Sequence, residues 1–309
     1  MSEKSYKTFW EQMAATPQGA MAAVDGSADE ETLQVTGRWT ANQMAHALLL
    51  KKSDRVLELG CGVGRIGREL ASQCGCWHGV DISDNMLRVA CTRTAHLTNV
   101  EFHLLSRASL TLFPDNAFDK AYAVAVFIHL DKEDVFLYLR ELARVLRPGG
   151  MVYFDNWNLA HEVGWKRWMR EVDYWAGVDQ SQQRKDVARN QFCVPEEVHL
   201  YVRKAGLAEL CCLTNSIWIQ MIAAKPGEGV DLGALQERVQ GHMAHIAFTP
   251  LWSQLFGELD EVLAGRKKPV DFWKELSDLR ETPEAAPYRQ YFLALWKTRR
   301  QQWGIPPLS

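Results

Sequence analysis

RVLELGCGVGRIG, at residues 55–67, is the stretch from which the architecture can be predicted. Its first five residues predict a short buried strand, the glycines predict a tight loop, and residues 65–73 predict a helix. Glycines at such a turn let the backbone approach a ligand, and the following helix N-terminus favours polar or anionic groups. The stretch is therefore a candidate binding loop between a strand and a helix.

Strand and helix patterns alternate after this loop. Strands are predicted at 77–81, 100–105, 118–127 and 151–155, and helices at 84–96 and 131–146. Residues 207–214 and 217–224 then predict a hairpin around a tight turn. Strands joined by helices predict an α/β fold with a parallel, doubly wound sheet, to which the hairpin adds one antiparallel strand.

The chain divides into three predicted parts. Residues 1–50 form an N-terminal helical segment, with helices over 5–15 and 39–50 and a loop over 17–29. Residues 51–225 form the sheet domain, with a polar, tryptophan-bearing insert at 156–192. Residues 226–309 form a C-terminal helical extension, with helices near 231–247, 251–265, 270–280 and 284–303.

Composition excludes several classes of protein. The 309 residues are 47% hydrophobic and 24% charged with a net charge of −3, which is globular and gives no basic surface for nucleic acid. The longest apolar run, 121–128, is far short of the ~20 residues of a membrane span, and no signal peptide is visible. The cysteine spacings are not those of zinc sites, so we expect reduced cysteines in a cytoplasmic protein.

Two acids bear on the ligand of the loop. GVGRIG at 62–67 also fits a dinucleotide fingerprint, so a nicotinamide dehydrogenase is one alternative. Glu58, however, lies two residues before Gly60, where a carboxylate disfavours a pyrophosphate and suits the cationic S-adenosylmethionine. Asp81 ends the next strand, where its carboxylate can accept hydrogen bonds from both ribose hydroxyls. The pair favours S-adenosylmethionine.

Four motifs in order, ELGCGVG at 58–64, GVDISDNM at 79–86, FPDNAFD at 113–119 and VLRPGG at 145–150, resemble those of class I S-adenosylmethionine-dependent methyltransferases. The resemblance implies a Rossmann-like seven-stranded sheet with its last strand antiparallel, and methyl transfer to O or N of a small molecule or glycan. The cofactor-binding residues it implies are Glu58, Gly60, Cys61, Gly62, Gly64, Asp81, Ile82, Met86, Ser106, Arg107 and Val126.

The pattern departs from this family at two places. Many members carry an acid after the third strand, whereas residues 104–108 here read LLSRA, so Ser106 or a backbone group would replace it. Arg65 follows Gly64 where small residues are common, and could stay in solvent or contact the substrate. The missing acid motivates one alternative function, a catalytically inactive S-adenosylmethionine-binding scaffold that acts through its helical tail.

Candidates for catalysis follow the fourth and fifth strands. His129 is the candidate general base, with a positional or helix-capping role as the alternative. Asp155 and Asn156 leave the fifth strand as an acid–amide pair like that of metal-dependent catechol-type enzymes, with Asp131 as a third possible ligand. Substrate contact or loop capping is the alternative, and we predict no metal.

Aromatic residues concentrate in the back half of the chain, where nine of the twelve tryptophans lie at or after Trp157. Trp165 and Trp168 share a helix face that either roofs the acceptor pocket or anchors the insert. The tail helices could cap the active site, form a homodimer, or contact a partner protein. We predict a small-molecule or glycan acceptor and no nucleic-acid or membrane partner.

Overall fold

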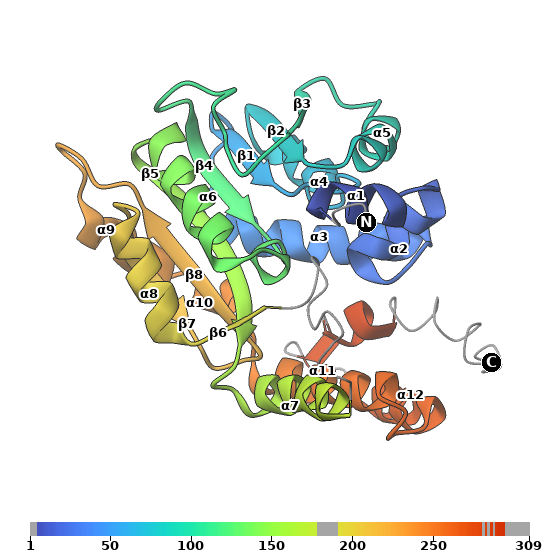
Figure 1. Cartoon of the computed structure of the whole chain (residues 1–309). Coiled ribbons are helices and arrows are strands. Elements are labelled where there is room, and N and C mark those ends of the chain that lie inside the picture. Colours follow the sequence, from blue (N-terminus) through green and yellow to red (C-terminus); the bar gives the residue numbers. More distant parts are fainter. Residues whose placement is uncertain (1–4, 178–190, 280–281, 283–284, 287, 294–309) are drawn as a thin grey trace.

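Figure 1 shows a twisted sheet with helices on both faces in the computed structural model, which describes residues 5–177, 191–279, 282, 285–286 and 288–293. The strand order is β3-β2-β1-β4-β5-β8-β7, and a two-residue strand, β6, pairs with β5 off this path. The strands are β1 (Arg55–Leu59), β2 (Cys76–Asp81), β3 (Val100–Leu104), β4 (Phe118–Ala123), β5 (Leu146–Asn158), β6 (Phe192–Cys193), β7 (Ala208–Leu213) and β8 (Trp218–Ala224).

Strand direction places the binding loop at one edge of the sheet. β1 pairs in parallel with both β2 and β4, so the chain order reverses between these neighbours. Parallel sheets bind ligands at such a switch point, beyond the carboxyl ends of the strands. β8 runs antiparallel to both β5 and β7. The predicted Rossmann-like sheet with an antiparallel last strand is confirmed, and β6 is the small addition.

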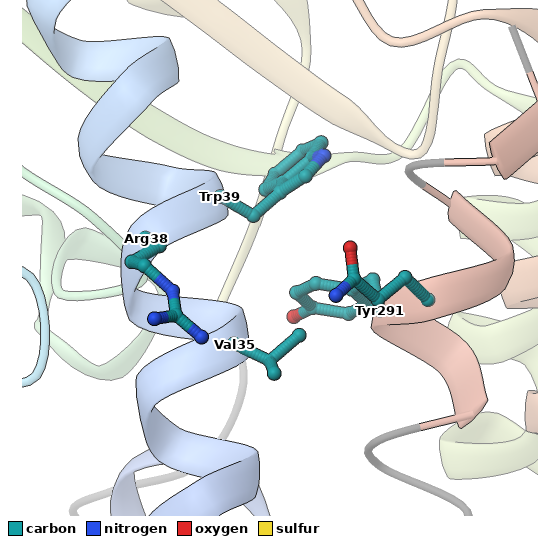
Figure 2. Close-up of a pocket in the computed structure, with 5 residues that line it drawn as sticks. Val35, Arg38, Trp39 and Tyr291 are labelled. Atoms are coloured by element: carbon teal, nitrogen blue, oxygen red, sulfur yellow. The ribbon is translucent and has the colours of Figure 1, made fainter. Parts of the chain in front are cut away.

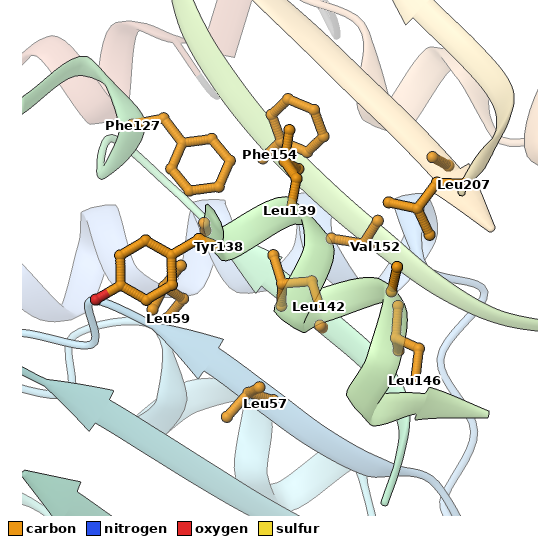
Figure 3. Close-up of a cluster of buried hydrophobic side chains, with 14 of the residues drawn as sticks. Leu57, Leu59, Phe127, Tyr138, Leu139, Leu142, Leu146, Val152, Phe154 and Leu207 are labelled. Carbon is orange, nitrogen blue, oxygen red and sulfur yellow. The ribbon is translucent and has the colours of Figure 1, made fainter. Parts of the chain in front are cut away.

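One face of the sheet is covered by α6 (Lys132–Val145) and α8 (Pro195–Lys204). Their apolar stripes pack on Leu57, Val152 and Phe154, which alternate with residues of the opposite face along their strands. Figure 3 shows Leu139 and Leu142 of α6 lying over these strand residues. These aliphatic and aromatic side chains form the core of this face.

The opposite face is covered by α3 (Glu30–Ala47), α4 (Gly67–Leu70), α5 (Asp84–Arg93), α9 (Leu232–Gln240) and α10 (Met243–Ile246). Trp77 and Tyr153 are fully buried here, together with Val239 and Ile246. Gln43 Nε2 of α3 donates to the carbonyl of Ile246 at 2.7 Å. α9 and α10 therefore complete the core of the sheet, although they follow its last strand.

The N-terminal segment contains one more helix than predicted. α1 (Tyr6–Met13) and α2 (Pro17–Asp25) precede α3, so the expected loop over 17–29 was wrong for most of its length. Thr16 accepts a hydrogen bond from the Gly19 N–H, and Pro17 occupies the first turn. These are standard helix-start features that the Gly/Ala-rich composition concealed.

Further boundaries differ from the sequence prediction. The helix expected over 39–50 is α3, which begins at Glu30. β4 ends at Ala123 rather than near 127, because Ala125 adopts a left-handed conformation (φ 56°) and a 3₁₀ turn, Phe127–His129, follows. β5 extends to Asn158, and the insert contains α7 (Glu162–Ala176) and β6. The helix expected at 65–73 is only α4 with a 3₁₀ turn, Ala71–Gln73.

The remaining helices, α11 (Pro250–Leu263) and α12 (Pro269–Asp278), form a separate aromatic cluster with residues 288–293. Arg167 and Arg170 of α7 both form ion pairs with the buried Asp260 of α11. Trp157 at the end of β5 stacks on Trp218 at 4.0 Å. α7, α11 and α12 thus lie beyond the carboxyl end of β5 (Figure 1). None of the described helices is long and apolar enough to cross a lipid bilayer.

Candidate active site

A cavity of about 560 Å³ opens at the carboxyl edge of β1, β2, β3 and β4. Its size lies within the range of about 300–1,000 Å³ of small-molecule sites. Ten of the eleven predicted cofactor residues line it, together with His129: Glu58, Gly60, Cys61, Gly62, Asp81, Ile82, Met86, Ser106, Arg107 and Val126. Gly64 is not among its lining residues. The structure brings the predicted set together, and the role of each residue remains a prediction.

Backbone forms one wall of the cavity. Gly60 and Gly62 have φ values of 67° and 50°, in the left-handed region that favours glycine. A Cβ at Gly60 would lie 2.5 Å from Val126 Cγ2, and one at Gly62 would lie 2.8 Å from Val24 Cγ2. Any side chain here would fill the space that the cavity needs. Gly64 serves the turn, since its N–H donates to the Cys61 carbonyl at 2.9 Å.

Asp81 is held by the backbone on both carboxylate oxygens. Oδ2 accepts from the Gly62 N–H at 2.8 Å, and Oδ1 accepts from the Ser83 N–H at 2.9 Å. The side chain is buried, and burial raises its pKa despite these hydrogen bonds. Each oxygen retains acceptor capacity, so Asp81 can also accept from a pair of hydroxyls at fixed positions.

Glu58 is the second acid in the wall. Its Oε2 accepts from Tyr122 Oη at 2.6 Å, and Tyr122 in turn accepts from Trp77 Nε1 at 2.9 Å. Burial raises the pKa of Glu58 to about 8, a shift that the Tyr122 hydrogen bond and the charge of Arg65 oppose. A cation bound beside this carboxylate would favour its ionised form.

The N-terminal helices close the cavity, which sequence reasoning missed. Tyr6, Trp10 and Val24 line it from α1 and α2. Glu11 of α1 holds this lid in place, because its carboxylate accepts from the Asp84 N–H at 2.8 Å and the Asn85 N–H at 3.2 Å. These are orphan amides of the first turn of α5. A sequence signal existed in the amphipathic pattern of residues 5–15.

His129 ends the 3₁₀ turn after β4 and lines the same cavity. Its ring meets the indole of Trp10 edge-to-face, with centroids 5.1 Å apart. Nearby, the Asp131 N–H donates to Tyr6 Oη at 2.7 Å, so this turn and α1 are joined. The His129 side chain therefore lies on the cavity wall between the strand edge and α1.

Arg65 is buried against α3 and lines the cavity, so the solvent-exposed alternative was wrong. Its Nη1 donates to Thr40 Oγ1 at 3.1 Å, and its Nε has no hydrogen-bond partner among the described residues. Asp155 accepts from the Ala125 N–H at 2.7 Å. Burial raises the pKa of Asp155 to about 7, opposed by this hydrogen bond and by Arg65. No spacing in the sequence predicts that the charge of Arg65 acts on Asp155.

Asp155 and Asn156 are adjacent on β5, where successive side chains point to opposite faces of the sheet. Asp155 lies on the face of Tyr153 and α3, whereas Asn156 Oδ1 contacts Cys193 Sγ of β6 at 3.8 Å. Both residues are buried. The two side chains are therefore not arranged to share one metal ion, and the absence of a metal requirement stays a prediction.

A second, smaller cavity of about 230 Å³ lies between α3 and residues 288–293. Val35 and Trp39 of α3 face Tyr291 across it (Figure 2), and the Trp39 and Tyr291 rings are 5.4 Å apart. Burial strongly raises the pKa of the Tyr291 hydroxyl. None of the predicted site residues lines this cavity, which belongs to the aromatic cluster of the C-terminal helices.

Comparison with known proteins agrees with this geometry. Residues 56–150 match the model of a methyltransferase domain family. Methyltransferase GfsG of Streptomyces halstedii is 34% identical over 124 residues, which cover 39% of this chain and 44% of that protein. The 2-methyl-6-phytyl-1,4-hydroquinone methyltransferase of Synechocystis sp. is 34% identical over 104 residues, covering 33% and 32%. The chain thus spans less than half the length of either relative.

Solved structures share the fold. Human N-acetylserotonin methyltransferase in complex with SAM superposes with a TM-score of 0.51 at 16% identity, covering 74% of this chain and 60% of that one. The putative methyltransferase in a complex with the Haloferax volcanii Trm112 activator gives 0.50 at 18%, covering 71% and 98%. The cofactor of this family is S-adenosylmethionine. The chain therefore contains a class I S-adenosylmethionine-dependent methyltransferase domain.

Proposed function

We propose that the protein transfers a methyl group from S-adenosylmethionine to an oxygen or nitrogen of a small-molecule acceptor. One observation carries the proposal. A single cavity is lined by the left-handed glycines, Asp81 and Glu58, and also by His129 and Arg65. The first group fits a cationic nucleoside, and the second offers polar groups to an acceptor.

The cofactor side fits by the chemistry of its donors and acceptors. Asp81 would accept the ribose hydroxyls, and the Glu58 carboxylate would neutralise the positive charge of the methionine end. Ile82 and Met86, which line the cavity after β2, offer apolar contact to a purine. No acid follows β3, so Ser106 and backbone groups there would contact the adenine edge.

When bound, the cofactor supplies a methyl group on a positively charged sulfur with a neutral leaving group. The protein then needs mainly to align the acceptor and exclude water. The α1 lid would contribute to that exclusion, because Trp10 and Tyr6 line the cavity. We assign proton acceptance from an O–H or N–H acceptor to His129, whose imidazole is suited to a general base.

Arg65 would orient the acceptor. A buried guanidinium with an unpartnered Nε is costly unless a ligand completes its hydrogen bonds. An acceptor oxygen beside Arg65 would supply this partner. The relatives include a hydroquinone methyltransferase and an O-methyltransferase of Aspergillus nomiae, which supports a small-molecule acceptor. A glycan acceptor has no comparable support in these names.

The inactive-scaffold alternative gains no specific support, since Ser106 and Arg107 line the cavity despite the missing acid. The test is turnover of the full chain with S-adenosylmethionine and a panel of phenols, quinols, amines and sugars, with S-adenosylhomocysteine release as the readout. Release that depends on one acceptor class and falls in His129→Gln supports the proposal. Cofactor binding with no release over the whole panel would favour the scaffold.

A further inference from the structure

We propose a divalent transition-metal site, best suited to zinc, on the outer strands of the sheet. It is formed by His78 of β2 with Glu101 and His103 of β3, and Cys76 lies beside them. β3 is the edge strand of the sheet (Figure 1). The site goes beyond the proposed function and is independent of it.

Strand geometry places all four side chains on one face. Cys76 and His78 are two residues apart on β2, as are Glu101 and His103 on β3. In the parallel register His78 lies opposite Glu101. Residues two apart on a strand share a face. This is the face of Val80 and Phe118, whereas Asp81, an odd number of residues from His78, points to the other face.

The donor atoms are already gathered at ligand spacing. His78 Nδ1 lies 3.2 Å from His103 Nε2 and 3.5 Å from Glu101 Oε2, and His103 Nε2 lies 3.8 Å from that same oxygen. Ligands at about 2.0 Å from a tetrahedral zinc ion are about 3.3 Å apart. Three donors from two strands therefore form nearly one face of a tetrahedron without backbone movement.

Cys76 contacts the second ring nitrogen of His78 and so supports the ligand geometry. Its Sγ lies 2.8 Å from His78 Nε2, the nitrogen that faces away from His103 and Glu101. Zinc-binding histidines commonly donate their second ring N–H to a carboxylate, a backbone carbonyl or water, which fixes the ring orientation. The Cys76 sulfur is placed to accept from His78 in the same way. A Cys76 donor atom also lies within 4.8 Å of donors on His78 and Glu101, so the thiolate can take the fourth position after a rotamer change.

Aromatic side chains hold both imidazoles. Phe118 and Phe113 meet His78 edge-on at 5.2 and 5.9 Å, and Phe113 meets His103 at 4.9 Å. His78 is buried, His103 is partly exposed, and Glu101 is exposed, so an ion can enter from the Glu101 side. Bound zinc would link β3 to β2 and so stabilise the β3 edge of the sheet.

The test uses the full chain after treatment with EDTA and gel filtration, titrated with Zn²⁺ by calorimetry. We expect one saturable ion per chain, binding weakened at least about tenfold in His103→Gln and in Glu101→Gln, and no change in the matched surface variant His96→Gln. Zn²⁺ should raise the melting temperature of the wild type and of His96→Gln, but not of His103→Gln.

Co²⁺ gives a second readout of the same site. A tetrahedral cobalt spectrum in the wild type that is lost in His103→Gln supports the assignment. A thiolate charge-transfer band that disappears in Cys76→Ser but persists in Cys91→Ser would make Cys76 a ligand. Unaltered S-adenosylmethionine affinity in His103→Gln shows that the variant is folded. Absence of saturable Zn²⁺ binding, or equal binding in wild type, His103→Gln and Glu101→Gln, overturns the proposal.

Discussion

The two ends of the sheet differ in the kind of residue that surrounds them. Around β1 and β2 the wall is backbone and two acids, with Gly62 and Asp81 bonded to each other. Beyond β5 and β8 the molecule is built from large aromatic side chains, such as Trp157 and Trp252. The family match ends at residue 150, inside β5.

This difference explains what each side can recognise. Few sequences can form a wall of glycines in the left-handed conformation and carboxylates at fixed positions. Such a wall fits one kind of ligand. An apolar aromatic surface can be built from many sequences and shaped for many acceptors. The cofactor can therefore be predicted from motifs, whereas we propose that recognition of the acceptor depends on surfaces particular to this chain.

Gly62→Val should abolish binding of the cofactor. The new Cβ would meet Val24 at 2.8 Å in a left-handed backbone conformation, and the side chain would enter the cavity. We expect no measurable S-adenosylmethionine binding by calorimetry. Gly229→Val is the matched control, because Gly229 has φ 71° and no neighbour within 4 Å. The control should lose some stability yet bind normally; equal affinity in both folded variants would place the cofactor elsewhere.

Truncation after Ala247 should preserve cofactor binding and abolish methyl transfer. The cut keeps α9 and α10, which complete the sheet core, and removes α11, α12 and the aromatic residues packed on Trp39 and Trp218. We expect S-adenosylmethionine affinity within about threefold of the full chain and turnover below detection. Circular dichroism and light scattering control for folding and for a lost dimer. Full turnover by a truncated monomer would rule out a role for these helices at the site.

Glu58→Gln should change how the stability of the protein depends on pH. Because burial raises the folded pKa of Glu58 to about 8, above its ordinary 4.5, its contribution to stability is present at low pH and is lost as pH rises through about 8. Glutamine keeps the shape without this titration. Relative to wild type, the unfolding free energy of the variant should therefore rise by at least about 1 kcal/mol as the pH increases from about 5 to about 8.5.

The affinity of wild type for the cofactor should rise with pH, whereas its stability should fall. The ionised Glu58 favours a cationic ligand, so S-adenosylmethionine should bind wild type more tightly at about pH 8.5 than at about pH 6, by roughly tenfold at most. Glu58→Gln should bind weakly at both values. Urea unfolding and calorimetry at these pH values measure both effects, and parallel pH profiles for the two proteins would argue against a charge interaction at Glu58.

Chelation should have the smallest effect on turnover. Asp155 and Asn156 face opposite sides of β5, so no ion is expected at the acceptor site. Turnover in EDTA should match that in buffer when assayed well below the melting temperature. Loss in EDTA with recovery in Mg²⁺ would instead make these residues ligands. Zinc lost from β2 and β3 would lower the melting temperature without this Mg²⁺ rescue.

Much of this fold and the cofactor wall could be predicted, because their signals are local in sequence. The strand–glycine–helix stretch places Gly60 and Gly62, and Asp81 follows from the end of the next strand. The docking of α1 on α5, the electrostatic effect of Arg65 on Asp155 and the cluster at His78 could not be predicted, because each joins residues far apart in the chain. The boundary at 225 also separated α9 and α10 from the core they complete. We propose that the peripheral extension begins after Ala247.

Calorimetric titration of Asp81→Ala against Asp84→Ala tests the assignment of the cofactor wall most directly. Asp81 is buried with both oxygens fixed at the cavity, whereas Asp84 is an acid three residues later that pairs with Arg88 on the surface of α5. Loss of two charge-assisted hydrogen bonds should weaken S-adenosylmethionine binding by roughly 2–4 kcal/mol in Asp81→Ala. Asp84→Ala should bind as wild type does. A change below about threefold in a folded Asp81→Ala protein would contradict the assignment.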